Sequence, residues 1–379
     1  MNTTSPRVAN YKYADIFVPN QNRTIFNHDI SSCSNEQVPG NDLYSGRALG
    51  LTEPSDIIQL HASLKQQWPY ITKHYQSIEL AFTQSVIWNT SYQLLSNYPQ
   101  YQPSFFYYGD EACDNNSKYY FYHIVNFIHS KNNFMSVAKD LDLPVPKTFC
   151  YYDKTFISDT AIFPYPCFLK AAVSVLSGAG IYRCENETEL FNALNQFDNN
   201  APIQIQEEVL ARSFVNVQYK ATSIGVERFA ATDQLLNGYS HIGNRYPTKF
   251  SCWHVTDPLA QYLYNKGMEG IFAFDVAVID EDNSINYRLI ECNPYYNTVS
   301  YPTWIAKKLA IESWTAENFS TRIRSLRQLD LSGIEFNQQQ GSGIILVNWG
   351  TILAGNISVL LVGSDTQQQA LRQQLLKRI

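Results

Sequence analysis

The spacing of apolar and polar positions changes along the chain. Residues 55–88 carry apolar side chains at roughly helical intervals, and residues 103–111 resemble a strand that runs into a turn. From about residue 165, apolar and polar positions alternate in short runs, as is typical of strands. We therefore expect a chain of mixed α/β and α+β class. Residues 1–125 would form an N-terminal α/β domain and residues 126–314 an α+β core. Residues 315–379 would form a small C-terminal α+β region, whose hairpin and helix complete the core.

A helix is predicted to begin at Ser130, whose side chain can cap it, and to end before Pro144. Its apolar stripe contains Phe134, Val137, Ala138 and Leu141. The segments that follow alternate, and they predict an antiparallel meander. Further helices are expected at 187–197 and 304–314, and strands at 165–172 and 202–210.

The clearest predicted hairpin is IFAFDVAVIDEDNSINYRLIECN, in which two alternating runs flank a polar turn. Side chains two apart on a strand share a face, so Glu291 and Asn293 project together and the hairpin brings Asp275 beside them. Arg288 and Ile290 are expected on the other face. Two carboxylates and an amide oxygen are hard ligands of the kind that Mg²⁺ prefers. The alternative is a polar sheet edge with solvated carboxylates.

One segment is long and apolar enough to raise the question of a membrane span. GIILVNWGTILAGNISVLLVG carries no charge. However, Asn348, Gly350, Gly355 and Asn356 interrupt it, and both halves are rich in β-branched residues. Two buried strands joined by a turn fit this pattern better than a transmembrane helix. A final helix, DTQQQALRQQLLKRI, follows.

Composition narrows the class of protein. Of the 379 residues, 45% are hydrophobic and 16% charged, which excludes a disordered chain. The net charge is −6 with no block of like charges, so neither nucleic acid nor an anionic membrane is an expected partner. The seven cysteines are odd in number and dispersed, which indicates reduced thiols rather than a disulfide framework or zinc site. The N-terminus has no signal-peptide core, and a cytoplasmic location is expected.

Two further segments suit a nucleotide. Lys170 ends a short strand, and the glycine-containing loop Ser177, Gly178, Ala179, Gly180 follows, so an ammonium and loop amides can meet a polyphosphate. This loop matches no standard phosphate-binding motif, and alone it is more often a tight turn. In QEEVL, the carbonyl of Glu207 and the amide of Leu210 could bind a nucleobase. Alone, this strand is more often an exposed edge.

Taken in order, these segments resemble a known family. The ordered set of segments resembles the ATP-grasp superfamily, which includes biotin carboxylase, D-alanine–D-alanine ligase and glutathione synthetase. The set consists of the helix ending in LPVPKT, then FLKAA and SGAG, then QEEVL, then D…IECNP. The resemblance covers about residues 125–310. It implies an ATP-grasp fold that follows a pre-ATP-grasp domain, with nucleotide held between two α+β subdomains under a lid at about 148–206.

The resemblance also implies roles for individual residues. Lys131 and Lys170 would contact ATP phosphates, with Lys170 also serving catalysis, and Ser177 to Gly180 would cover them. Adenine would lie against Glu207, Glu208, Val209 and Leu210. Asp275, Glu291 and Asn293 would hold one or two Mg²⁺ ions, with Mn²⁺ as a substitute.

The chain departs from the family at one position that matters for the reaction. Many carboxylate ligases have an arginine two places after the metal-binding asparagine, and this chain has Tyr295 there. Arg245 is the candidate catalytic replacement, and a surface arginine without a ligand is the alternative. Nearby His241 is a weaker candidate, because a lone histidine is more often structural. No carboxylate suited to the ribose is recognisable after QEEVL.

The resemblance implies an ATP-dependent carboxylate–amine ligase that forms an amide or peptide bond through an acyl phosphate and releases ADP and phosphate. Its partners would be a small carboxylic acid and an amine, such as an amino acid, a peptide or a natural-product acid. One alternative is a kinase of this fold that phosphorylates a small molecule, which the missing arginine favours. The other is a non-catalytic nucleotide-binding regulator. A homodimer is compatible with the sequence, which does not decide the oligomeric state.

Overall fold

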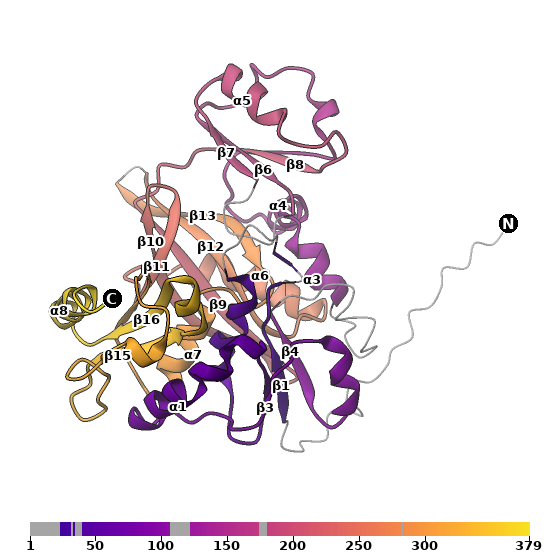
Figure 1. Cartoon of the computed structure of the whole chain (residues 1–379). Coiled ribbons are helices and arrows are strands. Elements are labelled where there is room, and N and C mark those ends of the chain that lie inside the picture. The colour runs from indigo at the N-terminus through magenta and orange to yellow at the C-terminus, as the bar shows by residue number, and fades with distance from the viewer. Residues whose placement is uncertain (1–22, 32, 35–39, 107–121, 174–179, 282) are drawn as a thin grey trace.

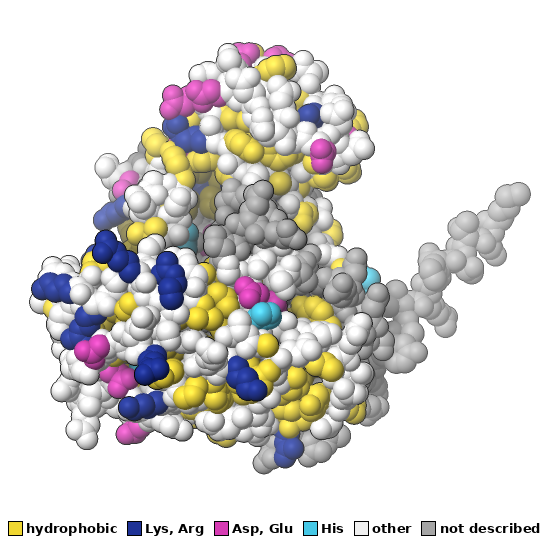
Figure 2. Space-filling model, in the orientation of Figure 1, with side chains coloured by type: hydrophobic (Ala, Val, Ile, Leu, Met, Phe, Trp, Pro, Cys, Tyr) yellow, Lys and Arg dark blue, Asp and Glu magenta, His cyan; other side chains and the backbone are white. Residues whose placement is uncertain are grey.

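The computed structural model describes residues 23–31, 33–34, 40–106, 122–173, 180–281 and 283–379. Its strands form three sheets, and the smallest lobe, the lid, stands above the rest of the molecule (Figure 1). A space-filling view shows the same two lobes, with a narrower waist between lid and body (Figure 2). The fold therefore consists of a body and a lid that projects from it.

The N-terminal sheet is parallel, with the order β3-β2-β1-β4. Its strands are β1 (Thr24–Asn27), β2 (Ile57–Gln59), β3 (Val86–Ile87) and β4 (Gln102–Phe105). The region expected to have helical spacing, residues 55–88, contains β2 and β3 as well as α1 (Trp68–Ser77), so only its middle is α-helical. Short 3-10 helices complete this part: η2 (Asn41–Leu51), η3 (Ala62–Gln67) and η4 (Tyr92–Asn97).

The lid is an antiparallel sheet in the order β5-β8-β6-β7. Its elements are β5 (Thr148–Tyr151), η5 (Lys154–Phe156), β6 (Cys167–Ala171), β7 (Ile181–Cys184), α5 (Glu187–Leu194) and β8 (Ile203–Glu207). Alternate residues of β6 and β8, such as Leu169 and Ile205, are fully buried and pack with Leu190 of α5 into a separate small core. The lid thus has its own hydrophobic core.

The largest sheet is antiparallel and runs β13-β12-β9-β10-β11-β14-β16-β15. Its strands are β9 (Ser213–Thr222), β10 (Gly225–Asn237), β11 (Ser240–Tyr246), β12 (Gly270–Glu281), β13 (Ser284–Asn293), β14 (Trp314–Ser320), β15 (Gly343–Asn348) and β16 (Asn356–Val362). The predicted hairpin of β12 and β13 is confirmed. The helix α6 (Trp253–Asn265) packs against one face of β9 and β10.

Two helices connect the N-terminal domain to the lid. These are α3 (Tyr122–His129) and α4 (Lys131–Asp140). The side chain of Ser130 accepts a hydrogen bond from the amide of Asn133, so the predicted N-cap is confirmed. Phe134, Val137 and Ala138 are buried, as the apolar stripe requires. This packing fixes the first residue of α4, Lys131, at the junction of lid and body.

The C-terminal elements close the large sheet. Residues 343–363 form β15 and β16, which pair antiparallel, so the predicted pair of buried strands is confirmed. Within the part of the chain that the structure describes, every helix is too short or too polar to cross a membrane. The helix expected at 304–314 is instead α7 (Ser300–Lys308), because Trp314 already begins β14. The last elements are η6 (Leu326–Gln328), η7 (Gly350–Ala354) and α8 (Asp365–Leu376).

Candidate active site

The large sheet carries a row of buried polar side chains on the face opposite α6. In β9, Val215, Val217 and Tyr219 point into the hydrophobic core, whereas Asn216 and Gln218 alternate with them and point to the other face. These two amide side chains are only 3% and 0% exposed. Buried amides need hydrogen-bond partners. This face is therefore built around polar groups, and we call it the polar face.

Asp275, on β12, is the residue of the polar face that accepts hydrogen bonds from three neighbouring amides. Its Cα pairs with that of Asn216 across β12 and β9. Its Oδ1 accepts hydrogen bonds from Asn216 Nδ2 at 2.7 Å and from Gln234 Nε2 at 2.6 Å. Its Oδ2 accepts one from Asn293 Nδ2 at 3.1 Å. Three amides from three strands thus hold this carboxyl group in place.

Glu291 stands beside Asp275 because the two residues are direct partners in the β12–β13 ladder. A β-bulge follows at once: Val276 pairs with Leu289, so Ile290 has no partner across the ladder. The bulge shifts the pairing by one residue, and Arg288 becomes the partner of Ala277, on the face of Asp275. The expectation that Arg288 faces away was wrong, because strict alternation fails across a bulge.

Two lysines meet the two carboxyl groups. Lys131 Nζ lies 3.1 Å from Glu291 Oε2, although its residue is only 6% exposed. Lys170 is similarly buried, and its Nζ donates to Gln206 Oε1 at 2.7 Å. The charge of Lys170 interacts with those of Glu291, Lys131 and Asp275. The structure therefore brings together lid and body residues that are far apart in the sequence.

Burial and mutual charge shift the pKa values of this cluster. Burial, and then the charge of Glu291, raises the pKa of Asp275 to about 7. Burial would also raise the pKa of Glu291, but the charges of Lys131 and Lys170 hold it below its ordinary value. Burial lowers the pKa of Lys170 to about 8. Without a ligand, the carboxyl group of Asp275 thus holds its proton up to about pH 7, and the ammonium group of Lys170 loses its proton above about pH 8.

The shifted pKa of Asp275 predicts a pH dependence of stability. Between its ordinary value near 4 and about 7, the folded protein holds a proton that the unfolded chain has released, so the free energy of unfolding should fall as pH rises through this window. Asp275→Asn should remove that fall. Urea denaturation of wild type and variant at about pH 5 and about pH 8 measures the difference.

Asp280→Asn is the matched control, because Asp280 lies on the same strand but is exposed. Its pH dependence of unfolding should follow that of the wild type. Identical pH profiles for the wild type and Asp275→Asn would contradict the assigned shift.

The cluster fits a divalent cation that is shared with phosphate oxygens. Among the described residues, no group of three or more His, Cys, Asp or Glu side chains could hold a metal. Asp275 and Glu291 supply two carboxylates, and Asn293 turns its Nδ2 toward Asp275, which leaves its amide oxygen as a further ligand. A cation here would also relieve the repulsion between the two carboxylates. The donor set suits Mg²⁺ whose remaining ligands are phosphate and water.

The predicted phosphate loop and adenine segment lie next to this cluster in the chain. Ser177, Gly178 and Ala179 fall outside the described residues. Gly180 has φ +69° and its carbonyl accepts from the Ala171 amide at 2.9 Å, directly after Lys170. A side chain at this φ would be strained, which is why glycine suits the loop end.

The adenine segment, Glu207 to Leu210, joins the end of β8 to β9. The Glu207 amide donates to the Lys147 carbonyl and the Glu208 amide to the Pro166 carbonyl. The Leu210 side chain is 89% exposed. The backbone of Glu207 and Glu208 is thus hydrogen-bonded to the lid, whereas Leu210 at the end of the segment is exposed.

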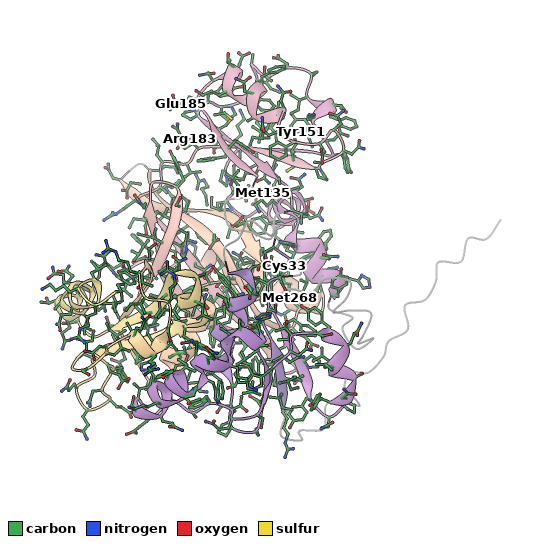
Figure 3. All side chains as sticks on the ribbon, viewed as in Figure 1. Cys33, Met135, Tyr151, Arg183, Glu185 and Met268 are labelled. Carbon is green, nitrogen blue, oxygen red and sulfur yellow. The ribbon has the colours of Figure 1, made fainter. Side chains whose placement is uncertain are left out.

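The Glu208 side chain links the lid to the body. Arg183 of β7 donates to both of its oxygens, from Nε at 2.9 Å and Nη2 at 2.7 Å, and the Tyr239 hydroxyl donates to Oε1 at 2.6 Å. Tyr239 lies in the turn between β10 and β11, and Arg183 lies on the lid (Figure 3). These contacts join the lid to the turn between β10 and β11 through the side chain of Glu208, and the predicted adenine role of this segment stays a prediction.

Arg245 does not reach the carboxyl groups. The β10–β11 register pairs Arg245 with Asp233 and Asn244 with Gln234, so Gln234 and Asn244 share the polar face and Arg245 points to the opposite one. Arg245 is also exposed. We expected Arg245 to replace the missing arginine, but neighbouring residues of a strand point to opposite faces, and it is Asn244 that faces the site.

For the ligase expected from the sequence, Arg245→Ala should therefore leave ATP-dependent ADP release within about twofold of the wild type, as is usual for exposed positions. Asn244→Ala is the informative comparison, because Asn244 donates from Nδ2 to Thr232 Oγ1 at 3.0 Å on the polar face. It should lower kcat/KM for the acceptor substrate by about tenfold, the effect of one lost buried hydrogen bond. Steady-state ADP-release assays measure both, and a large loss in Arg245→Ala would refute the assigned direction.

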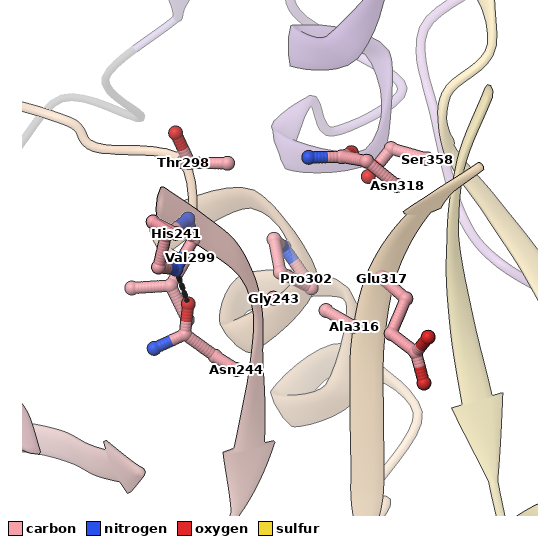
Figure 4. Close-up of a pocket in the computed structure, with 10 residues that line it drawn as sticks. All are labelled: His241, Gly243, Asn244, Thr298, Val299, Pro302, Ala316, Glu317, Asn318 and Ser358. Atoms are coloured by element: carbon pink, nitrogen blue, oxygen red, sulfur yellow. Dashed lines mark hydrogen bonds between the residues drawn. The ribbon is translucent and has the colours of Figure 1, made fainter. Parts of the chain in front are cut away.

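A pocket extends the polar face toward β14 and α7. It is lined by His241, Gly243, Asn244, Thr298, Val299, Pro302, Ala316, Glu317, Asn318 and Ser358 (Figure 4). The His241 Nε2 and the Asn244 Oδ1 lie 2.6 Å apart, and burial lowers the pKa of His241, so its ring stays neutral at neutral pH. A Cβ at Gly243 would clash with the carbonyl oxygen of Ala316, so only glycine lets β11 and β14 approach here. His241 thus lines a cavity.

Sequence reasoning missed most of the polar face: Asn216, Gln218, Thr232, Gln234 and Asn244. A signal existed in VNVQYK, where polar and apolar residues alternate in a strand. Alternation alone indicates a surface strand with one wet face. Only the structure shows that both faces of β9 are buried, which makes the amides part of a site.

No protein-family model matches the chain, and no curated protein matches its sequence. Its structure, however, is similar to that of N5-carboxyaminoimidazole synthetase from Staphylococcus aureus complexed with ADP, with a TM-score of 0.59, 13% identity, and coverage of 94% of this chain and 96% of that one. The chain has the ATP-grasp fold. The fold expected from the sequence is therefore confirmed.

Two other solved structures with this fold support the assignment. One is N5-carboxyaminoimidazole ribonucleotide synthetase from Thermus thermophilus, with a TM-score of 0.58, 10% identity, and coverage of 94% of this chain and 98% of that one. The other is the biotin carboxylase–β-γ-ATP complex from Campylobacter jejuni, with a TM-score of 0.57, 13% identity, and coverage of 94% and 91%. The similarity spans nearly the whole chain and so includes the N-terminal sheet and the C-terminal strands as well as the lid.

Proposed function

We propose that this protein is an ATP-dependent carboxylate–amine ligase that forms an amide or peptide bond through an acyl phosphate and releases ADP and phosphate. One observation carries the proposal: in an ATP-grasp fold, Lys131, Lys170, Asp275 and Glu291 meet where the lid joins the body. The solved structures with this fold include synthetases complexed with ADP and a carboxylase complexed with an ATP analogue. These complexes support a nucleotide as the ligand of this protein, and the buried lysines and carboxyl groups are the reason to propose the junction as its site.

The residues of the cluster would act by position and charge. Lys131 and Lys170 are buried cations that a triphosphate would neutralise, which would restore the ordinary pKa of Lys170. Asp275, Glu291 and Asn293 would hold Mg²⁺, which when bound would screen the charge on the phosphates. The amides of Asn216 and Gln234 keep Asp275 oriented. Lid residues above the cluster would exclude water from an acyl phosphate.

The acceptor substrate would lie along the polar face, in the pocket beside His241 and Asn244. The row from Asp275 through β9 and β10 to Asn244 crosses three strand spacings, or about 14 Å. An acid and an amine bound end to end, or a substrate of peptide length, would cover such a span and reach a phosphate group. The partners we propose are a small carboxylic acid and an amine.

A kinase that transfers phosphate to a hydroxyl is the second candidate. The Tyr295 hydroxyl lies 2.8 Å from His129 Nε2, and its ring packs on Phe106, so this position belongs to the core. The site that often holds a carboxylate-binding arginine thus cannot serve the reacting group here. Without a cation at this place, a hydroxyl acceptor remains compatible with the geometry.

The decisive experiment is an ADP-release screen of paired acids and amines, followed by mass spectrometry of the products. A ligase should release ADP only with a carboxylate present, and hydroxylamine should trap its acyl phosphate as a hydroxamate. Phosphorylation of an alcohol without trapping would favour the kinase. ATP binding without any turnover would leave a regulator.

A further inference from the structure

A buried arginine of the N-terminal domain has an unpaired edge. Arg47 of η2 is 5% exposed, and its guanidinium carbon lies 4.1 Å from the ring centroid of Phe106, 4.6 Å from that of Tyr301 and 5.2 Å from that of Tyr44. Among the described residues, neither Nε nor Nη2 has a hydrogen-bond partner. Rings stabilise the charge through their faces but do not accept in-plane N–H bonds. Such a buried cation is costly unless an acceptor completes it.

The two unpaired nitrogens lie on one edge of the guanidinium group. Other arginines of this protein use the same edge to bind a carboxylate with two parallel bonds. Arg183 holds Glu208 through Nε at 2.9 Å and Nη2 at 2.7 Å. Arg228 holds Asp257 through the same pair of nitrogens. The edge of Arg47 is therefore the right shape for a carboxylate or a phosphate.

The position of Arg47 also favours a ligand. It packs on Phe106, which follows β4, at the carboxyl end of the parallel sheet. The order β3-β2-β1-β4 reverses between β1 and β4, and open parallel sheets bind ligands outside the carboxyl ends of their strands at such a reversal. Arg47 is close enough to Cys33 for its charge to oppose the rise in the pKa of that thiol caused by burial. Cys33 lies in the body, below the lid (Figure 3).

A neutral histidine at this edge of the sheet lies within hydrogen-bond distance of side chains from two other segments. His28 follows β1, and its Nδ1 lies 2.8 Å from the Tyr301 hydroxyl while its Nε2 lies 3.0 Å from Ser104 Oγ. Burial, and then the charge of Arg47, holds the pKa of His28 well below its usual range. His28 therefore does not compete for an anion as a cation, and it positions Tyr301 against Arg47.

The same segment of chain touches Arg47 and the polar face. Tyr301 lies in the first turn of α7, and Asn297, just before this helix, donates from Nδ2 to Asn216 Oδ1 at 3.4 Å. We propose that Arg47 binds an anionic group, a carboxylate or a phosphate, of the small-molecule substrate on which the protein acts. This inference rests on the proposed function. It assigns substrate recognition to the N-terminal sheet and requires that the substrate be an anion.

The test uses the full chain without nucleotide or magnesium. Isothermal titration with inorganic phosphate and, separately, with acetate should show that at least one binds the wild type. Arg47→Lys should weaken that binding by about 10- to 100-fold, because an ammonium cannot present two parallel donors. Arg47→Met should abolish it. The stronger of the two probes identifies the anionic group.

Three controls make the result specific. Arg372→Lys changes a half-exposed arginine of α8 that pairs with Glu317 of β14, and this variant should bind the probes like the wild type. Lys170→Met removes phosphate binding at the nucleotide site and should keep the Arg47-dependent binding. Circular dichroism and the unfolding temperature verify that each variant is folded, and Arg47→Lys, which keeps the charge and the stem, carries the test if Arg47→Met does not fold.

The outcomes separate the two proposals. If neither probe binds the wild type, or if Arg47→Lys and Arg47→Met bind the probes as the wild type does, the anion site is refuted. MgATP titrated in parallel tests the proposed function on its own. A protein that binds MgATP but shows no Arg47-dependent anion binding keeps its ligase proposal and loses only this inference.

Discussion

Glu291→Gln is expected to lower MgATP-dependent ADP release by at least about 100-fold, equivalent to about 3 kcal/mol of transition-state stabilisation. The variant removes a carboxylate that pairs with Lys131 at 3.1 Å and lies beside Asp275 in the ladder. It would remove a magnesium ligand and leave the buried Lys131 without this partner. A coupled ADP assay gives the rate, and calorimetry gives the affinity for MgATP.

Glu281→Gln is the matched control for this prediction. Glu281 lies on the same hairpin, is exposed, and pairs with Arg288 at 2.9 Å. Its activity should stay within about twofold of the wild type, because exposed ion pairs contribute little. Wild-type turnover in Glu291→Gln would show that the carboxylate pair does not serve the nucleotide, and the metal assignment would fall with it.

Lys170→Met is expected to weaken MgATP binding by about 10- to 100-fold, the effect of losing a charge-assisted hydrogen bond in a buried site. Stability should change little. The variant removes an ammonium group that burial disfavours, since the pKa of Lys170 is about 8, but it leaves Gln206 Oε1 without its donor. Titration calorimetry with MgATP and thermal unfolding measure both quantities.

The wild type also provides a pH test of the same lysine. As pH rises through about 8, Lys170 loses its proton in the free protein, so the affinity for MgATP should fall, and Lys170→Met should lack this step. Lys139→Met is the control, because Lys139 lies on α4 but donates to the Thr148 carbonyl instead of meeting the cluster. If Lys170→Met and Lys139→Met bind MgATP equally well, the phosphate role of Lys170 must be abandoned.

The strand that carries Glu291 shows how far periodicity reaches. Alternation correctly predicted that Glu291 and Asn293 share a face. Asp275 joins them, as expected, but only because of the bulge: an unbroken ladder from the turn, where Glu281 pairs with Ser284, would place Ile290 opposite Asp275. Alternation also placed Arg288 on the face opposite Glu291, which is wrong because the bulge at Ile290 lies between these two residues. A bulge depends on the neighbouring strands and leaves no reliable mark in a single sequence.

Arg245 and Arg47 show the same limit for single charged residues. The sequence offered Arg245 as a candidate because it lies in a segment rich in Gly and Asn, but the register turns it away from the site by one position. Arg47 attracted no attention, since an arginine in a polar region is usually on the surface. Its burial under three rings arises from segments distant in the chain.

By itself, the sequence determined the ordered set of local elements: the capped helix that begins with Lys131, the strand that ends near Lys170, and the hairpin of Asp275 and Glu291. These follow from spacing and capping, which act over a few residues. Only the tertiary structure decided which polar side chains became buried together, because the cost of burying an amide or a charge depends on atoms contributed by other parts of the chain.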